Sequence, residues 1–173
     1  MQTTTPLRLL IIILLSILAA FFLRDHIAER IYVPTPSMEP AMPAGTHWWQ
    51  EKLTLLLREP RRGDVIVFES PLGDSKELIK RVIAVAGETV VIENKEVSIN
   101  GSVLSEPYKH HDTDMIFAGD NLGPLTVPAH HVFVLGDNRD HSGDSRDWHD
   151  VKTGEPVYFI AASKIRGKVF GVR

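Results

Sequence analysis

The stretch Glu77–Ala86, ELIKRVIAVA, indicates the architecture of the chain most directly. In an extended strand, successive side chains point to opposite faces of the sheet, so this stretch has two distinct faces. Lys80 is the only ionisable residue on its face, which it shares with Leu78, Val82, Ala84 and Ala86. On the other face Arg81 lies among aliphatic side chains, and we expect it to form an ion pair. The stretch therefore predicts a strand that holds one lysine in apolar surroundings.

Other short extended segments are predicted on both sides of this strand. They cover residues 64–69, 89–93, 96–99, 102–104, 131–135 and 164–172. The pair Asn100-Gly101 is typical of the tight turn of a hairpin. Several short strands joined by turns indicate a mainly β domain, built as a coiled antiparallel sheet or a barrel. We expect the polar segment 105–128 to be a variable excursion over the surface.

The composition excludes several classes of protein. The chain has 173 residues, of which 43% are hydrophobic and 24% charged, with a formal net charge of −3 and no cysteine. This length suits one domain with a real core. The charge predicts no nucleic-acid partner. Without cysteine, the chain has no disulfide, no thiol nucleophile and no thiolate metal site.

The apolar residues are concentrated near the N-terminus. Residues 9–23, LLIIILLSILAAFFL, contain one polar side chain, that of Ser16. As a helix this run covers roughly 22 Å of a ~30 Å hydrocarbon core, and it could extend to about residue 31. We predict an uncleaved transmembrane anchor, because no small-x-small cleavage site follows the run; a removed secretory signal is the alternative. Lysine and arginine favour neither orientation, and a short N-terminal segment, residues 1–8, is compatible with a cytoplasmic position.

Ser37 is a candidate nucleophile. It lies in a stiff loop, residues 33–43, in which four prolines restrict the backbone. A serine that is held in place suits nucleophilic attack. An ordinary serine in a turn is the alternative interpretation.

Lys80 is a candidate general base. An ammonium group held among aliphatic side chains is poorly solvated, so we expect its pKa to fall toward neutrality. A neutral lysine can take the proton of a serine hydroxyl. A lysine that reaches solvent at a strand edge, or a paired structural cation, is the alternative.

Residues 136–146, GDNRDHSGDSR, form a third candidate segment. Asn138, Asp140, Ser142 and Gly143 match the first positions of a calcium-binding loop, but His149 stands where that loop requires a bidentate glutamate. We therefore predict no metal here, and expect a polar turn that orients catalytic side chains. The eight histidines show no metal-binding spacing, and the pairs His110-His111 and His130-His131 have no predicted role.

Together these segments resemble the bacterial type I signal peptidases, membrane-anchored serine proteases with a Ser–Lys dyad. The matching boxes, in chain order, are Ser37-Met38-Glu39-Pro40, Arg62-Gly63-Asp64-Val65, Lys80-Arg81-Val82-Ile83, and residues 136–140 followed by Ser142, Asp144, Ser145 and Arg146. The resemblance covers about residues 9–146. It departs from the family at Ala41, Ala86 and His141, where threonine, proline and asparagine are common.

The resemblance implies a role for particular residues. Ser37 would be the acylated nucleophile and Lys80 its general base. Ser142 would hydrogen-bond the lysine ammonium, and Thr35 would donate a hydrogen bond to the oxyanion. Asp144 and Arg146 would form a supporting ion pair. The residues that would line pockets for small side chains before the cut are Val33, Met42, Leu78 and Ile79. No cofactor is implied.

The implied function is removal of N-terminal signal peptides from exported preproteins, by way of an acyl-enzyme, after sites of the Ala-x-Ala type. The partners would be membrane-tethered preproteins and the lipid bilayer. The location would be the bacterial inner membrane, with a single span and the catalytic domain, residues 32–173, on the extracytoplasmic side. Two alternatives remain: a specialised processing peptidase of the same family, acting on conjugation or pilus substrates, and a non-catalytic membrane-tethered β interaction domain.

Overall fold

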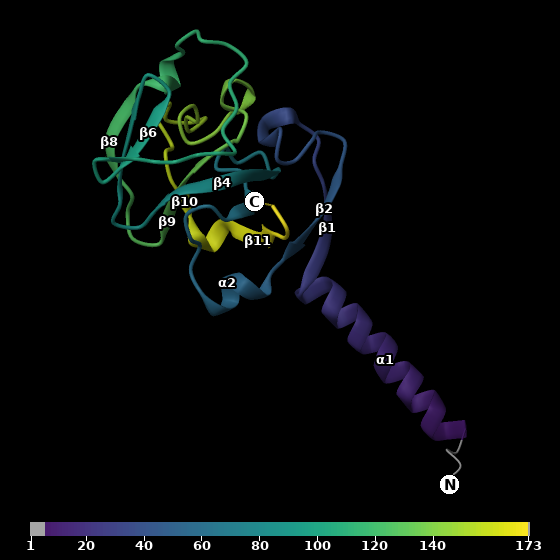
Figure 1. Cartoon of the computed structure of the whole chain (residues 1–173). Coiled ribbons are helices and arrows are strands. Elements are labelled where there is room, and N and C mark those ends of the chain that lie inside the picture. The colour runs from purple at the N-terminus through teal and green to yellow at the C-terminus, as the bar shows by residue number, and fades with distance from the viewer. Residues whose placement is uncertain (1–5, 173) are drawn as a thin grey trace.

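The chain forms a projecting helix followed by a β domain (Figure 1). A computed structural model describes residues 6–172, so residues 1–5 of the predicted N-terminal segment lie outside the described residues. A single residue separates helix α1 (Pro6–His26) from strand β1 (Ala28–Tyr32). The extension of the helix to about residue 31 is therefore wrong, because all five residues of β1 pair with β2 (His47–Glu51).

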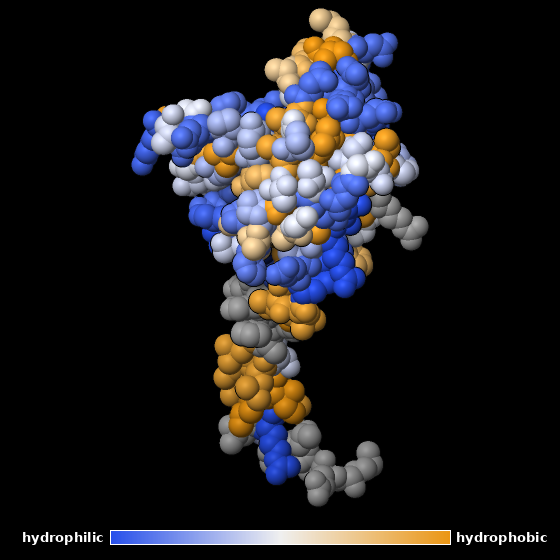
Figure 2. Space-filling model, turned by 90° about the vertical axis from the view of Figure 1, so that its left-hand side faces the viewer, coloured by the Kyte–Doolittle hydropathy of each residue, from blue (hydrophilic) through white to orange (hydrophobic). Residues whose placement is uncertain are grey.

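The described apolar side chains of α1 are exposed. Leu10 and Leu15 expose 65% and 60% of their surface. Figure 2 shows hydrophobic residues gathered along this helix, below the domain. Among the described residues, no helix combines the length and the apolar character needed to cross a membrane.

The larger sheet has seven strands in the order β1-β2-β11-β3-β4-β9-β10. All neighbouring pairs are antiparallel. Its further strands are β3 (Val65–Glu69), β4 (Glu77–Val85), β9 (His131–Leu135), β10 (Ile160–Ala161) and β11 (Ile165–Val169). The predicted mainly β, antiparallel architecture is confirmed, and β4 lies inside the sheet between β3 and β9.

The smaller sheet has four strands in the order β7-β6-β5-β8. These are β5 (Thr89–Glu93), β6 (Glu96–Ile99), β7 (Ser102–Val103) and β8 (Leu122–Thr126). Short helices connect the strands: η1 (Pro36–Met38), α2 (Leu53–Leu57), η2 (Ala118–Asp120), η3 (Arg139–His141) and η4 (Ala162–Lys164). The predicted surface excursion over residues 105–128 therefore includes a strand, β8, which pairs with β5 at the edge of this sheet.

The larger sheet is strongly curved. Strands β1 and β4 are separated by three strands in its order, yet residues of both line one cleft. The concave side encloses a core of buried side chains: Ile31, Val33, Met38, Met42, Val65, Val67 and Val169. Curvature brings the segment that follows β1 over the beginning of β4.

Strand β4 does not keep strict alternation along its whole length. Its pairing with β9 shifts between Val82 and Ala84, so Ile83 is an extra residue at a bulge. Ile83 and Ala84 pack in one core cluster, whereas Val82 belongs to another. The prediction that Val82 and Ala84 share a face is therefore wrong.

Candidate active site

Ser37 lies in the one-turn helix η1. Pro36 precedes it in the turn, and the backbone N–H of Glu39 donates to the Pro36 carbonyl at 3.0 Å. Met38 is fully buried in the core of the larger sheet and fixes the turn from below. The Ser37 side chain is also withdrawn from solvent, with 6% of the residue exposed. This turn therefore presents a serine hydroxyl from a fixed backbone.

Lys80 reaches the same point from the middle of β4. Its ammonium nitrogen Nζ lies 2.8 Å from Ser37 Oγ, across a sequence separation of 43 residues. Only 4% of the lysine is exposed. The two groups predicted to work together are thus in hydrogen-bond contact, and both are buried.

Burial of Lys80 changes its proton affinity. The pKa of Lys80 falls from 10.5 to about 8, mainly because burial removes solvation from the ammonium group, and the positive charge of Arg146 acts in the same direction. The carboxylates of Asp144, Asp137 and Asp147 act in the opposite direction and offset only part of this effect. An appreciable fraction of Lys80 is therefore neutral near physiological pH.

The loop over residues 136–146 packs against the Ser37 turn. The backbone N–H of Asn138 donates to the Ser37 carbonyl at 3.1 Å. A Cβ at Gly136 would lie 2.4 Å from that carbonyl oxygen and 2.2 Å from Ser142 Oγ. Glycine is required here because two segments approach its backbone closely.

Ser142 does not make the hydrogen bond expected of it. Its hydroxyl oxygen is buried and has no hydrogen-bond partner among the described residues. The contact with Lys80 implied by the resemblance is thus absent from this structure. Ser142 nevertheless lies beside Gly136, next to the turn that carries Ser37.

Asp144 and Arg146 form the expected ion pair. Arg146 Nε lies 2.8 Å from Asp144 Oδ1, and the second carboxylate oxygen accepts the Gly136 N–H at 3.1 Å. Arg146 also donates to the carbonyl of Arg139 at 2.7 Å. Neither side chain is free to turn toward solvent, so the pair ties the two ends of the loop together.

Thr35 lies beside the nucleophile. Its hydroxyl oxygen is 3.3 Å from Ser37 Oγ, and the residue is exposed. The Thr35 hydroxyl can therefore donate a hydrogen bond to a carbonyl group that reacts at Ser37. Among the described residues, the hydroxyls of Thr35 and Lys80's partner Ser37 lie next to each other, but Thr35 itself makes no hydrogen bond to Lys80.

A cleft of about 390 Å³ opens next to Ser37 and Lys80. Three of the four predicted pocket residues, Val33, Leu78 and Ile79, line it. The fourth, Met42, is fully buried in the core beneath and does not reach the cleft. Its role is to support the Ser37 turn from below.

The opposite walls of this cleft are strands β1 and β4. Residues 77–80 of β4 pair only with β3, because pairing with β9 begins at Arg81. The first half of β4 therefore keeps an open edge that faces β1 across the cleft. An extended peptide can add to such an edge by main-chain hydrogen bonds.

Arg81, on the opposite face from Lys80, makes the predicted ion pair. Its guanidinium binds both oxygens of Asp137, at 2.7 and 2.6 Å, and donates to the Gly63 carbonyl at 3.1 Å. The guanidinium also lies 4.0 Å from the centre of the Tyr108 ring. Sequence reasoning missed Tyr108, since nothing in the polar segment around it marks a contact with β4.

The histidines stand apart from the dyad. His110 and His141 both bind Asp112, His111 binds Asp140, and His130 pairs with Glu59 at the surface. Among the described residues, no cluster of histidine and acidic side chains has the geometry to hold a metal ion.

Comparisons with known proteins identify relatives of this chain. The family model described as signal peptidase, peptidase S26, matches residues 7–172. The chain is 38% identical to signal peptidase I of Leptolyngbya laminosa over 141 residues, which cover 78% of this chain and 67% of that protein. It is 30% identical to signal peptidase I P of Bacillus subtilis subsp. natto over 168 residues, 89% of each chain.

A solved structure is also similar to this chain. The crystal structure of a signal peptidase I from Enterococcus faecalis V583 is 32% identical, with a TM-score of 0.49. The match covers 64% of this chain and 97% of that chain. The family match and the curated relatives confirm the resemblance that the four sequence boxes indicate.

Proposed function

The chain belongs to the signal peptidase family, peptidase S26, and is a serine endopeptidase that removes signal peptides from preproteins; we propose that it does so with a dyad of Ser37 and Lys80. The observation that carries this proposal is the 2.8 Å contact between Lys80 Nζ and Ser37 Oγ. The pKa of Lys80, lowered to about 8, makes it able to accept the serine proton.

In the proposed reaction, neutral Lys80 accepts the proton of Ser37 as the serine oxygen attacks the scissile carbonyl. The backbone N–H of Ser37 and the hydroxyl of Thr35 donate to the oxyanion. The Lys80 ammonium then protonates the leaving amine as the C–N bond breaks. Neutral again, Lys80 activates the water that hydrolyses the acyl-enzyme.

We propose that Ser142 stabilises Lys80 when the lysine is protonated. Its hydroxyl is buried, unpartnered among the described residues and close to the Ser37 turn through Gly136. A hydroxyl has acceptor capacity for an ammonium N–H, so it would stabilise the cation that forms in the transition state. Asp144 and Arg146 hold the loop that carries it.

The substrate would bind as an extended strand along the open edge of β4. Residues 77–80 offer unpaired main-chain groups, and β1 closes the other side of the cleft. Val33, Leu78 and Ile79 make the lining apolar beside Ser37. Such pockets select by excluding bulk, so we expect cleavage after small residues in sites of the Ala-x-Ala type.

We propose that α1 lies in the lipid bilayer as an N-terminal anchor. The support is the run of residues 9–23 with one polar member and the exposure of its described apolar side chains. The β domain would lie on the extracytoplasmic side of the bacterial inner membrane, with the N-terminus in the cytoplasm. Alkaline extraction of membranes tests the anchor: a chain whose α1 is inserted in the bilayer stays in the membrane pellet.

Cleavage of a preprotein tests the dyad. Ser37→Ala should abolish processing, while Ser102→Ala, an exposed serine on β7, should process at the normal rate. Processing by Ser37→Ala would remove the proposal. A wild-type chain that binds preproteins without cutting them would favour the alternative of a non-catalytic interaction domain.

Rescue of a peptidase-depleted strain separates a general signal peptidase from a specialised one.

A further inference from the structure

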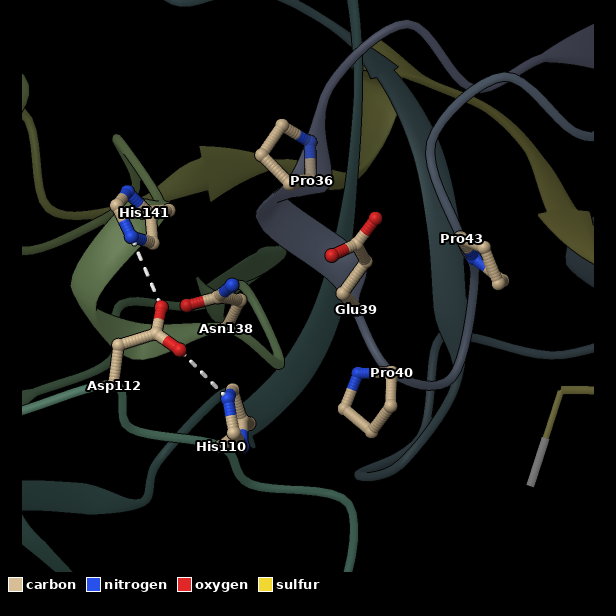
Figure 3. Close-up of a pocket in the computed structure, with 8 residues that line it drawn as sticks. All are labelled: Pro36, Glu39, Pro40, Pro43, His110, Asp112, Asn138 and His141. Carbon is tan, nitrogen blue, oxygen red and sulfur yellow. Dashed lines mark hydrogen bonds and ion pairs between the residues drawn. The ribbon is translucent and has the colours of Figure 1, made fainter.

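A second pocket is built on the same turn as the cleft but shares no lining residue with it. It has a volume of about 500 Å³, within the range of ligand-binding pockets. Figure 3 shows Glu39 and three prolines of the Ser37 loop on one side of it, and His110, Asp112, Asn138 and His141 on the other. Pro36, the neighbour of Ser37, forms part of its wall.

The pocket is rich in hydrogen-bond acceptors. Asp112 bridges two histidines, with 2.9 Å from each carboxylate oxygen to the Nε2 atoms of His110 and His141. Glu39 holds the Ala44 N–H with one oxygen at 3.0 Å. Two carboxylates thus face one space, which therefore disfavours a negatively charged occupant.

Asn138 gives an independent indication of a ligand. Only 3% of this residue is exposed, and its side-chain oxygen has no hydrogen-bond partner among the described residues. In Figure 3 that oxygen points to the side of the pocket on which Asp112 lies. A buried acceptor without a donor costs free energy, so a complementary occupant would bring N–H groups. The Asn138 backbone is itself fixed to the Ser37 carbonyl at 3.1 Å.

We infer that this pocket receives the first residues of the mature chain, on the C-terminal side of the scissile bond. The inference rests on the proposed function, in which the cleft beside β4 holds the residues before the cut. A peptide whose reacting carbonyl lies at Ser37 Oγ continues past the turn, and at roughly 3.3 Å per residue its next two or three residues span a pocket of this kind. A main-chain N–H would pair with Asn138.

The same pocket would set a charge preference. With carboxylates at Glu39 and Asp112, a glutamate in the early mature chain meets like charge, whereas a glutamine of the same shape does not. The two peptides compared are identical before the cut, so the cleft beside β4, which is itself lined by charged as well as apolar residues, contributes equally to both. Discrimination between glutamine and glutamate therefore assigns this pocket to the mature side.

The test uses peptide substrates that differ only by glutamine or glutamate at the first, second or third position after the cut. For at least one position, we expect the wild-type kcat/KM to favour glutamine by roughly tenfold, the size of a partly screened like-charge contact. Glu39→Gln and Asp112→Asn should each bring that ratio toward one. Glu96→Gln, an exposed residue on β6, should leave the ratio unchanged. Because each ratio is formed within one enzyme, partial loss of folded protein cancels.

A binding measurement separates this inference from the dyad. Ser37→Ala protein is titrated with the mature-side peptide alone, and the imidazole NMR signals of His110 and His141 should shift while that of His130 does not. If wild-type enzyme cleaves, Ser37→Ala does not, and neither ratio nor imidazole signals respond, the inference is wrong and the dyad stands. If Ser37→Ala cleaves, the dyad is wrong and the inference falls with it.

Discussion

Lys80 and Arg81 are neighbours in one strand, both cations and both buried, yet they are surrounded in opposite ways. Arg81 holds a carboxylate with both arms of its guanidinium, at 2.7 and 2.6 Å from Asp137. Lys80 contacts a neutral hydroxyl at 2.8 Å and no carboxylate within ion-pair distance among the described residues. One face of β4 thus neutralises its charge, and the other leaves a charge uncompensated.

The difference separates a structural cation from a reactive one. A buried arginine stays protonated and can only serve as a permanent positive charge. A buried lysine without a carboxylate partner loses its proton readily, because burial penalises the ammonium form. The strand therefore uses its two faces for two purposes: Arg81 fixes the loop over residues 136–146, and Lys80 has the proton affinity that catalysis needs.

The strongest test exchanges the two cations. Lys80→Arg keeps the charge but cannot give a neutral base, so we expect cleavage of a preprotein to fall by at least about 10³-fold. Arg81→Lys keeps a charge beside Asp137 and should retain most of the cleavage. Activity per folded molecule, with folding followed by circular dichroism, measures both variants. Equal losses of cleavage in the two variants would contradict the different roles given to the two faces of β4.

The next test removes the paired cation. Arg81→Met leaves Asp137 buried without a partner, and breaking such a pair costs about 3–5 kcal/mol of unfolding free energy. Denaturant unfolding of the variant and the wild type gives this difference. Arg166→Met, on an exposed arginine that pairs with Glu69, is the matched control and should change stability little. A loss no larger than that of the control would contradict a structural role for Arg81.

Removal of the other cation should have the opposite sign. The folded-state pKa of Lys80 is about 8, below the unfolded value of 10.5. Below pH 8 both states carry the charge, so its burial destabilises the fold, and this cost disappears as the pH rises to 10.5. Lys80→Met should therefore raise the unfolding free energy at pH 7, by roughly 3 kcal/mol at most. Unfolding at pH 7 and pH 10 checks both sign and window.

The smallest effect is the pH dependence of cleavage. Because neutral Lys80 is the reactive form, kcat/KM should rise about tenfold per pH unit below 8 and level off above it. Asp144 raises the pKa of Lys80, so Asp144→Asn should move the midpoint to lower pH whatever its effect on the total rate. A rise that continues beyond pH 10 would mean that Lys80 is solvated.

Strands with a strong residue preference could be predicted from the sequence. The β-branched runs at Val65–Glu69, Glu77–Val85 and His131–Leu135 form strands where expected. Strands β1 (AERIY) and β8 (LGPLT) were missed, because charged residues in one and Gly-Pro in the other hide the pattern of an edge strand. Each lies at the end of its sheet and is stabilised by its neighbour.

The site was predictable only where a motif carried it. The boxes around Ser37 and Lys80 identify the two groups, but local sequence says nothing of a contact made across 43 residues. The partner of Arg81 is 56 residues away, and the bulge at Ile83 depends on how β9 pairs. Met42 shows the same limit: the family resemblance implies a place in a pocket wall, whereas packing turns its side chain into the core.

Gly136 has a consequence for how this enzyme can vary. Any side chain there would overlap the Ser37 carbonyl oxygen and Ser142 within 2.5 Å. A saturation library at this position should return one amino acid among active clones, while the exposed walls of both pockets accept many. Changes in substrate preference would then accumulate at residues that line the two pockets, while position 136, behind the nucleophile, would remain glycine.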